Sequence, residues 1–250
     1  MNAPESSAAT ILSDGRRSSE SADHFTQLMC AWSGPVATIL ALLGMVILSG
    51  FIPATNPAAS GREIADFYLK NLAGIRFGLV ISMIAFTLLV PFGIAVAIQT
   101  RRIEQKPILT YVQIACVAIA SLEGIMSTAI WLTASFRPDV IDPDITRMLH
   151  DLGWICFLVD VPPFSVWVGV IGMAILRDRH AIPLFARWIG FFNIWCAILF
   201  LPALLIPFFK SGPFAYNGLL ALYLPFGAFF IWVVVMTPAV LKAIGTRRNP

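Results

Sequence analysis

The segment 81–97 reads ISMIAFTLLVPFGIAVA and contains no charged residue. A run this apolar is typical of a helix that crosses a bilayer, because about 20 such residues span the roughly 30 Å of hydrocarbon. Strands of a membrane β-barrel would instead alternate apolar and polar residues over about ten positions. The segment therefore indicates a membrane-spanning α-helix.

Similar apolar stretches occur along the rest of the chain. Of its 250 residues, 58% are hydrophobic and only 12% are charged, whereas a soluble domain carries about 25% charged residues. We therefore predict an all-α fold, a polytopic membrane bundle of six transmembrane helices within 28–244. The predicted spans are 32–52, 75–99, 109–134, 148–176, 184–209 and 215–241.

The basic residues of the loops and tails predict the orientation of these spans. One side of the membrane receives Arg16, Arg17, Arg101, Arg102, Lys106, Arg177, Arg179, Arg187, Lys242, Arg247 and Arg248. The other side receives Arg62, Lys70, Arg76, Arg137, Arg147 and Lys210. Both termini are therefore predicted to be cytoplasmic. Segment 1–27 is polar and is expected to be a disordered tail, with a second short tail at 245–250.

The longest outer loop contains a helix start signal. Ser60 and Glu63 have the spacing of a capping box, and Ile64, Phe67 and Tyr68 follow at helical spacing. We predict a short amphipathic helix over about 61–72 at the outer membrane surface. It acts either as a lid that shields the bundle or as a gate over a substrate entrance.

A second outer loop carries three acidic residues, Asp139, Asp142 and Asp144. The loop lacks the glycine and the distal glutamate of a calcium-binding loop. Asp144 is predicted to be the N-cap of the helix that enters the fourth span.

Two acidic residues lie near the middle of predicted spans. Glu123 and Asp160 each lie about 16–18 Å from the outer helix end, at 1.5 Å per residue, in adjacent antiparallel spans. A charged residue at this depth is costly, so it normally faces the protein interior and finds a partner. No Lys, Arg or His lies in the central part of any predicted span. If the two carboxyl groups meet, we expect the pair to hold a proton or a bound cation.

The stretch LVDVPPFS at 158–165 places two prolines next to Asp160. Pro162 and Pro163 cannot donate backbone hydrogen bonds, which predicts a helix break and free carbonyl groups beside the carboxylate. Broken helices at the membrane midplane often form cation sites in transporters. In the third span, Gln113 and Ser127 belong to a polar stripe with Glu123 and are further candidates for proton or cation binding.

Other interpretations of these carboxyl groups remain open. Protonated acidic side chains also join helices through hydrogen bonds, and prolines are common in membrane helices. A catalytic pair is a third possibility. His150 and Asp151 lie at the outer start of the fourth span and either collect protons for a route toward Asp160 or occupy the membrane interface, with the histidine snorkelling.

Pro-Phe pairs recur at 91–92, 163–164 and 225–226, all in spans predicted to run from outside to inside. This recurrence would suggest three related helical hairpins. The same pair also occurs at 207–208 and 213–214, which such a scheme does not explain. No mechanism is built on the repeat.

Several kinds of site are not expected. The three histidines lie outside the predicted membrane centre, which argues against haem or di-iron sites. The four cysteines are never spaced as CxxC and are interpreted as core residues. No nucleotide-binding or hydrolase motif occurs, and the small net charge of +3 gives no reason to expect nucleic acid. We expect no metal, no cofactor and no assigned catalytic residue.

The segments LHDLGW at 149–154, FARWIGFFNIW at 185–195 and FFKSGPFAYNGL at 208–219 resemble those of small six-span membrane proteins of actinobacteria and proteobacteria. The resemblance covers about 60–250. It implies the bacterial inner membrane as the location and supplies neither an activity nor a site residue.

The leading hypothesis is a membrane protein that transports or passes a small solute, coupled to protons or cations. One alternative is a non-catalytic membrane subunit or assembly factor of a larger complex. Another is an intramembrane enzyme that acts on a lipid-soluble substrate, although a role without catalysis is preferred. The lipid bilayer is the expected environment, and Gly74-x-x-x-Gly78 offers a close-packing edge for a second copy or a partner subunit.

Overall fold

The structure, a computed structural model, describes residues 4–159 and 161–246, and side chains from Ser21 onward. Within these residues it is all α-helical, and six stretches are long and apolar enough to cross a membrane. The predicted all-α six-helix bundle is confirmed. The six stretches are Ser21–Leu48, Leu72–Arg101, Ile108–Ala134, Pro143–Leu176, Arg187–Phe208 and Leu219–Gly245.

Three of these stretches combine α-helix with another helix type. The first contains α1 (Pro4–Ala41) and the π-helical η1 (Leu42–Leu48), the fifth contains α7 (Arg187–Phe200) and the 3₁₀ segment η2 (Leu201–Phe208), and the sixth contains the π-helical η3 (Leu219–Tyr223) and α8 (Leu224–Gly245). Long π-helical runs are rare in proteins and often lie at functional sites.

The other elements are regular α-helices. The fourth stretch is described as α5 (Pro143–Val159) and α6 (Val161–Leu176), on either side of position 160. The second and third stretches are α3 (Leu72–Arg101) and α4 (Ile108–Ala134), and the short α2 (Gly61–Lys70) precedes α3.

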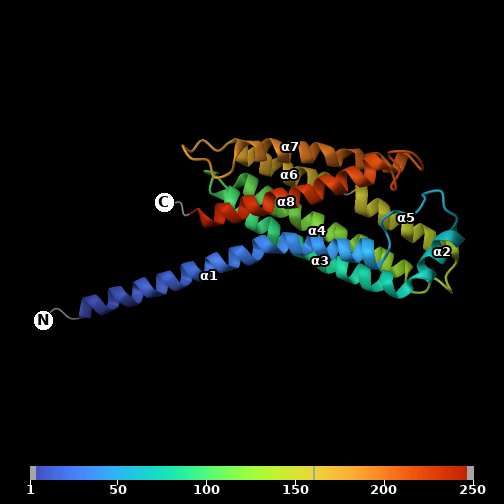
Figure 1. Cartoon of the computed structure of the whole chain (residues 1–250), viewed down its shortest axis with the longest axis horizontal. Coiled ribbons are helices and arrows are strands. Elements are labelled where there is room, and N and C mark those ends of the chain that lie inside the picture. The colour runs from blue at the N-terminus through green and yellow to red at the C-terminus, as the bar shows by residue number, and fades with distance from the viewer. Residues whose placement is uncertain (1–3, 160, 247–250) are drawn as a thin grey trace.

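The helix α1 begins much earlier than the first predicted span. It starts at Pro4 and continues through the segment for which a disordered tail was predicted. Figure 1 shows this part of α1 extending away from the bundle. Residues added to an existing helix need no new nucleation, so a polar segment joined to an apolar helix can continue it.

The six spans form a closed ring in which each packs against two neighbours. Starting from α1, the order of contacts is α3, α4, α6, α7 and α8, and α8 returns to α1. The start of α1 and the end of α8 lie at one end of the bundle, and α2 lies at the other end (Figure 1). The described ends of the chain, at Pro4 and Thr246, therefore lie on one side of the bundle, and the assignment of that side to the cytoplasm stays a prediction.

Gly74 and Gly78, the glycines of the predicted oligomer edge, make close contacts within their own chain. A Cβ atom on Gly78 would collide with the carbonyl oxygen of Gly44 in η1, and one on Gly74 would collide with Asn71. The backbones of η1 and α3 can approach closely because neither Gly44 nor Gly78 has a side chain. The Gly74-x-x-x-Gly78 edge thus packs against η1 of the same chain, and a role in oligomerisation stays a prediction.

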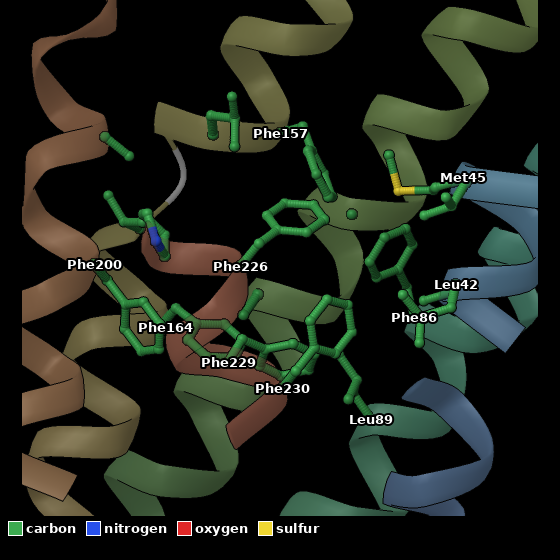
Figure 2. Close-up of a pocket in the computed structure, with 18 residues that line it drawn as sticks. Leu42, Met45, Phe86, Leu89, Phe157, Phe164, Phe200, Phe226, Phe229 and Phe230 are labelled. Atoms are coloured by element: carbon green, nitrogen blue, oxygen red, sulfur yellow. The ribbon is translucent and has the colours of Figure 1, made fainter. Parts of the chain in front are cut away.

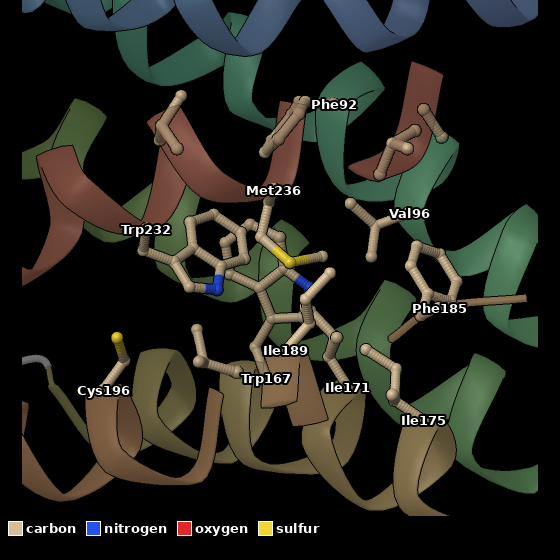
Figure 3. Packing of buried hydrophobic residues seen from close by; sticks show 14 of the residues in the cluster. Phe92, Val96, Trp167, Ile171, Ile175, Phe185, Ile189, Cys196, Trp232 and Met236 are labelled. Atoms are coloured by element: carbon tan, nitrogen blue, oxygen red, sulfur yellow. The ribbon is translucent and has the colours of Figure 1, made fainter. Parts of the chain in front are cut away.

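The termini end of the ring is filled by the Trp232 cluster, a group of buried residues that includes Phe92, Trp167, Trp232 and Met236 (Figure 3). These side chains come from α3, α6 and α8 and are fully buried. Asn193 of α7 accepts a hydrogen bond from the indole N–H of Trp232 over 2.8 Å. This contact satisfies the buried donor and ties α7 to α8.

The α2 end is filled by the Trp154 cluster, which includes Phe51, Tyr68, Trp131 and Trp154. The predicted capping box is confirmed, because Ser60 and Glu63 each accept a hydrogen bond from the other's backbone N–H. The amphipathic helix begins here as expected. Its apolar face, including Ile64 and Tyr68, is buried, and α2 packs against α5.

The cap of α5 differs from the prediction. The carboxylate of Asp142 accepts a hydrogen bond from the backbone N–H of Asp144, with a donor–acceptor distance of 2.8 Å. Asp142, rather than Asp144, therefore caps the first turn. Asp144 instead pairs with Arg147 over 3.3 Å on the exposed surface. The helix starts two residues earlier than expected because Pro143 occupies its first position, where a missing backbone donor costs nothing.

Candidate functional site

Glu123 lies in the middle of α4 and is only partly buried. Its Oε2 atom is shielded from solvent and has no hydrogen-bond partner among the described residues. Ser127 does not contact this carboxylate, because its hydroxyl donates to the backbone carbonyl of Glu123 over 2.9 Å. The carboxylate therefore keeps an unused acceptor inside the membrane region.

Asp160 lies outside the described residues, so the predicted pairing with Glu123 stays a prediction. Its described neighbours end α5 at Val159 and begin α6 at Val161. Pro162 and Pro163 lie within the described residues of α6, and the predicted helix break at these prolines stays a prediction.

Gln113 is fully buried but is separated from Glu123 along α4 by about 15 Å, at 1.5 Å per residue. Its amide exchanges hydrogen bonds with the hydroxyl of Thr100 in α3, over 3.0 and 3.2 Å. The Gln113 amide and the Thr100 hydroxyl thus serve as each other's hydrogen-bond partners. Gln113 thus joins α3 to α4 and is not brought together with Glu123.

A cavity lies inside the ring, between the Trp232 cluster and the Trp154 cluster (Figure 2). Its volume is about 130 Å³. Every span of the ring contributes to its wall, and all 18 described lining residues are apolar. We call it the phenylalanine cavity, because seven of them are Phe86, Phe157, Phe164, Phe200, Phe226, Phe229 and Phe230.

The walls of the phenylalanine cavity link it to the unusual helix segments. Leu42, Met45 and Val46 of η1 line one side, and Pro225 and Phe226, just after η3, line another. Leu158 and Val161, which flank position 160, also line it, as does Gly124 beside Glu123. The cavity is thus lined by residues that are close in sequence to both predicted acidic positions, and its own lining presents apolar side chains.

A second cluster, at the α2 end, is centred on His150. The ring is fully buried, so the predicted snorkelling position at the membrane interface is wrong. Thr55 Oγ1 lies 2.7 Å from His150 Nε2, and the Tyr68 hydroxyl lies 3.1 Å from Nδ1. The indole of Trp154 also donates to Nε2 over 3.1 Å. The loop after η1, α2 and α5 meet at this one side chain.

These contacts assign the tautomer of His150. An indole N–H only donates, so Nε2 must accept and carries no proton. The neutral ring then holds its proton on Nδ1 and donates it to the Tyr68 hydroxyl. The Thr55 hydroxyl is left to donate to Nε2 as well. The cluster holds α2 and the 51–60 loop against α5.

Asp151 takes part in the same region through a different partner. The Tyr216 hydroxyl donates to its carboxylate over 3.4 Å, from the segment before η3. Burial raises the pKa of Tyr216 to about 12. A hydrogen bond with Thr55 lowers this pKa, and the negative charge of Asp151 raises it. Burial raises the pKa of Tyr68 well above its usual value, and the Tyr216 and Asp151 charges add to this. Both phenols stay protonated at neutral pH.

In comparisons with known proteins, no family, no characterised protein and no solved structure matches this chain. The site therefore has to be interpreted from its own geometry.

Sequence reasoning missed the partners of His150 and the phenylalanine cavity. Thr55, Tyr68 and Tyr216 come from three separate segments, and no spacing in the sequence connects them. The recurring Pro-Phe pairs did carry a signal, because Phe164 and Phe226 both line the cavity. Phe92, from the third pair, belongs instead to the Trp232 cluster.

Proposed function

We propose that this integral membrane protein holds an apolar, lipid-soluble molecule in the phenylalanine cavity. One observation carries the proposal: a cavity among membrane-spanning helices is lined by apolar side chains, seven of them phenylalanines. Such a wall offers dispersion contacts and aromatic edges and supplies no hydrogen bonds. It suits a molecule that reaches the protein through the bilayer.

The size of the cavity limits what it holds. An apolar cavity of about 150 Å³ stays dry and binds benzene or xenon, and the volume here is about 130 Å³. We therefore expect one ring, or a branched segment of similar size, to occupy it. The rest of a larger molecule would extend between helices toward the lipid.

The π-helical segments support this assignment. The segment η1 supplies three of the residues that line the cavity, and the lining residues Pro225 and Phe226 follow shortly after η3. A π-helical turn widens a helix and shifts side chains relative to a regular α-helix, which opens space that close packing would fill. We infer that these segments keep the cavity open.

A second candidate function is proton- or cation-coupled transport. It is supported by the unpartnered Oε2 of Glu123, because an unused carboxylate oxygen inside a membrane is costly and is retained mainly for function. Gly124, next to Glu123, lines the cavity. An ion route through the cavity itself is disfavoured, since its wall gives ions and water no polar contact.

An enzyme that acts on the bound molecule is the least supported role. None of the described residues that line the cavity is titratable or nucleophilic. The membrane in question is inferred to be the bacterial inner membrane, from the charge bias of the loops and from the sequence resemblance.

Solvent extraction of the purified protein, followed by mass spectrometry, tests the proposed binding. The variant Ala120→Leu adds side-chain volume to the cavity wall, and Ala118→Leu makes the same change on an exposed position of α4. Wild type and Ala118→Leu should retain an apolar compound in roughly equimolar amount, because one cavity holds one occupant. Ala120→Leu should lose it. Equal extracts from the two variants would overturn the proposal.

A further inference from the structure

A second cavity, the basic groove, lies at the termini end of the bundle. It is formed between the 102–107 loop that joins α3 to α4 and the 176–180 segment that follows α6. With about 950 Å³ it is much larger than the phenylalanine cavity. Its lining combines basic and apolar side chains, so its chemistry differs from that of the site described above.

Three exposed cations of the basic groove are available to a ligand. Lys106, Arg177 and Arg179 line it and form no ion pair within the described part of the chain. Arg102 serves the fold instead, because its guanidinium donates to the backbone carbonyls of Ala243 and Thr246 at the end of α8.

The one carboxylate of the basic groove is turned toward the backbone. Glu104 lines the groove, but its Oε2 accepts the N–H of Leu109 over 3.1 Å at the start of α4. The guanidinium of Arg101 donates to the backbone carbonyl of Glu104. Glu104 thus shapes the loop and forms no ion pair with the three cations among the described residues.

Asp178 holds two of these cations in place. Its carboxylate accepts the backbone N–H groups of His180 and Leu184, over 3.0 and 2.9 Å, and lies 2.6 Å from Nδ1 of His180. The Asp178 side chain is 1% exposed. Because it is anchored inward, its two neighbours Arg177 and Arg179 are held on the exposed side.

Apolar side chains also line the basic groove. Ile103, Ile108, Leu109, Ala174 and Leu176 line it, at the ends of two membrane-spanning helices. Cations and apolar side chains in one groove at the ends of membrane-spanning helices match a phospholipid, whose phosphate lies at the interface and whose acyl chains lie in the hydrocarbon.

We propose that the basic groove binds the headgroup of an anionic phospholipid from the surrounding leaflet. Arg177 and Arg179 present planar guanidinium groups, which bind phosphate oxygens in pairs, and Lys106 adds a mobile charge. This site is separate from the phenylalanine cavity and does not depend on what that cavity holds.

Native mass spectrometry tests the assignment on the full chain, with phosphatidylglycerol and phosphatidylcholine offered in equal amounts. The variant Lys106→Gln/Arg177→Gln/Arg179→Gln removes the three cations. The control Arg62→Gln/Lys70→Gln/Arg137→Gln removes three exposed cations elsewhere. Each basic residue near an anionic headgroup is worth about a factor of five, so the first variant should weaken retention about tenfold or more. The control should match wild type.

A conservative variant guards against a change in membrane orientation. Arg177→Lys/Arg179→Lys keeps every charge that guides insertion but loses the paired guanidinium contacts. It should retain phosphatidylglycerol at a level between wild type and the triple variant. Retention that is equal in wild type and the groove variants, or equal for the two lipids, would overturn the proposal. Displacement of the lipid by millimolar inorganic phosphate would also overturn it, because the ligand would then be a soluble anion.

Discussion

The indole N–H of Trp154 donates to Nε2 of His150 over 3.1 Å, and both residues lie on α5, one turn apart. Since the indole cannot accept, this contact fixes the histidine in its neutral form with the proton on Nδ1. A protonated ring would direct an N–H at another N–H. The buried histidine is therefore a structural joint between α2, the 51–60 loop and α5.

Replacing this joint should destabilise the fold. His150→Ala leaves the side-chain groups of Thr55, Tyr68 and Trp154 without their shared partner in a buried site. We expect a loss of about 2–4 kcal/mol, measured as a lower midpoint of thermal unfolding in detergent. His24→Ala, at an exposed position of α1, should leave the midpoint unchanged. Equal midpoints for the two variants would contradict this role.

Gly78 should not tolerate a methyl group. In Gly78→Ala the new Cβ would meet the carbonyl oxygen of Gly44, and backbone cannot move aside as a side chain can. We expect a loss of about 1–3 kcal/mol in the free energy of unfolding. Gly227→Ala in α8 is the matched control, because nothing lies within 4 Å of its Cβ position. In that variant the free energy of unfolding should increase by about 1 kcal/mol, because alanine has a higher helix propensity than glycine. The two variants should therefore change the free energy of unfolding in opposite directions.

Acid should weaken the loop after α6 through Asp178. Burial alone would raise the pKa of this carboxylate, but the N–H groups of Leu184 and His180 and the His180 ring outweigh it and lower the pKa. The unfolded value is about 3.9. The stabilisation is therefore complete above that pH and is lost as the pH falls through the lower folded value.

Unfolding midpoints measured against pH check this linkage. Asp178→Asn should be less stable than wild type at neutral pH, and the gap should close below about pH 4, where wild type loses its carboxylate. A gap that stays constant across this range would argue against it.

Glu123 should be replaceable without loss of the fold. Glu123→Gln keeps the shape of the side chain and breaks no ion pair among the described residues. Unfolding midpoints should therefore stay close to that of wild type. In liposomes with a pH-sensitive dye, coupled transport predicts proton flux in wild type and in Ser127→Ala, and none in Glu123→Gln or Asp160→Asn. Wild-type flux no greater than that of empty vesicles would remove this second candidate function.

The fold could be predicted from local patterns. Uninterrupted apolar length predicted the six spans, and the Ser60 and Glu63 spacing predicted the start of α2, because each depends on residues that are close in sequence. The closure of the helices into a ring was not predictable, since apolar length does not say which face of a helix meets which neighbour. Gly78 illustrates this: its motif predicted close packing, but the motif did not say that η1 of the same chain would be the helix packed against it.

The candidate site was only partly predictable for the same reason. His150 was identified as a candidate, but its burial depends on Thr55 and Tyr68, which fold over it from another part of the chain. Residues of both packed clusters line the phenylalanine cavity, and no residue type encodes such a cavity. Its phenylalanines come from separate apolar spans, so the sequence did not show that they would line one cavity.

Photolabelling with a trifluoromethyl phenyl diazirine, followed by peptide mapping, tests the central claim most directly. Its single aromatic ring matches the size of the cavity. Adducts near Phe157 and Phe226, which line the cavity, should saturate with probe concentration and fall sharply in Ala120→Leu. Adducts near Ile231 and Val234, which are 57% and 70% exposed, should increase in proportion to the probe and be unaffected. If the cavity positions are labelled no differently from these exposed positions, the phenylalanine cavity is not a binding site.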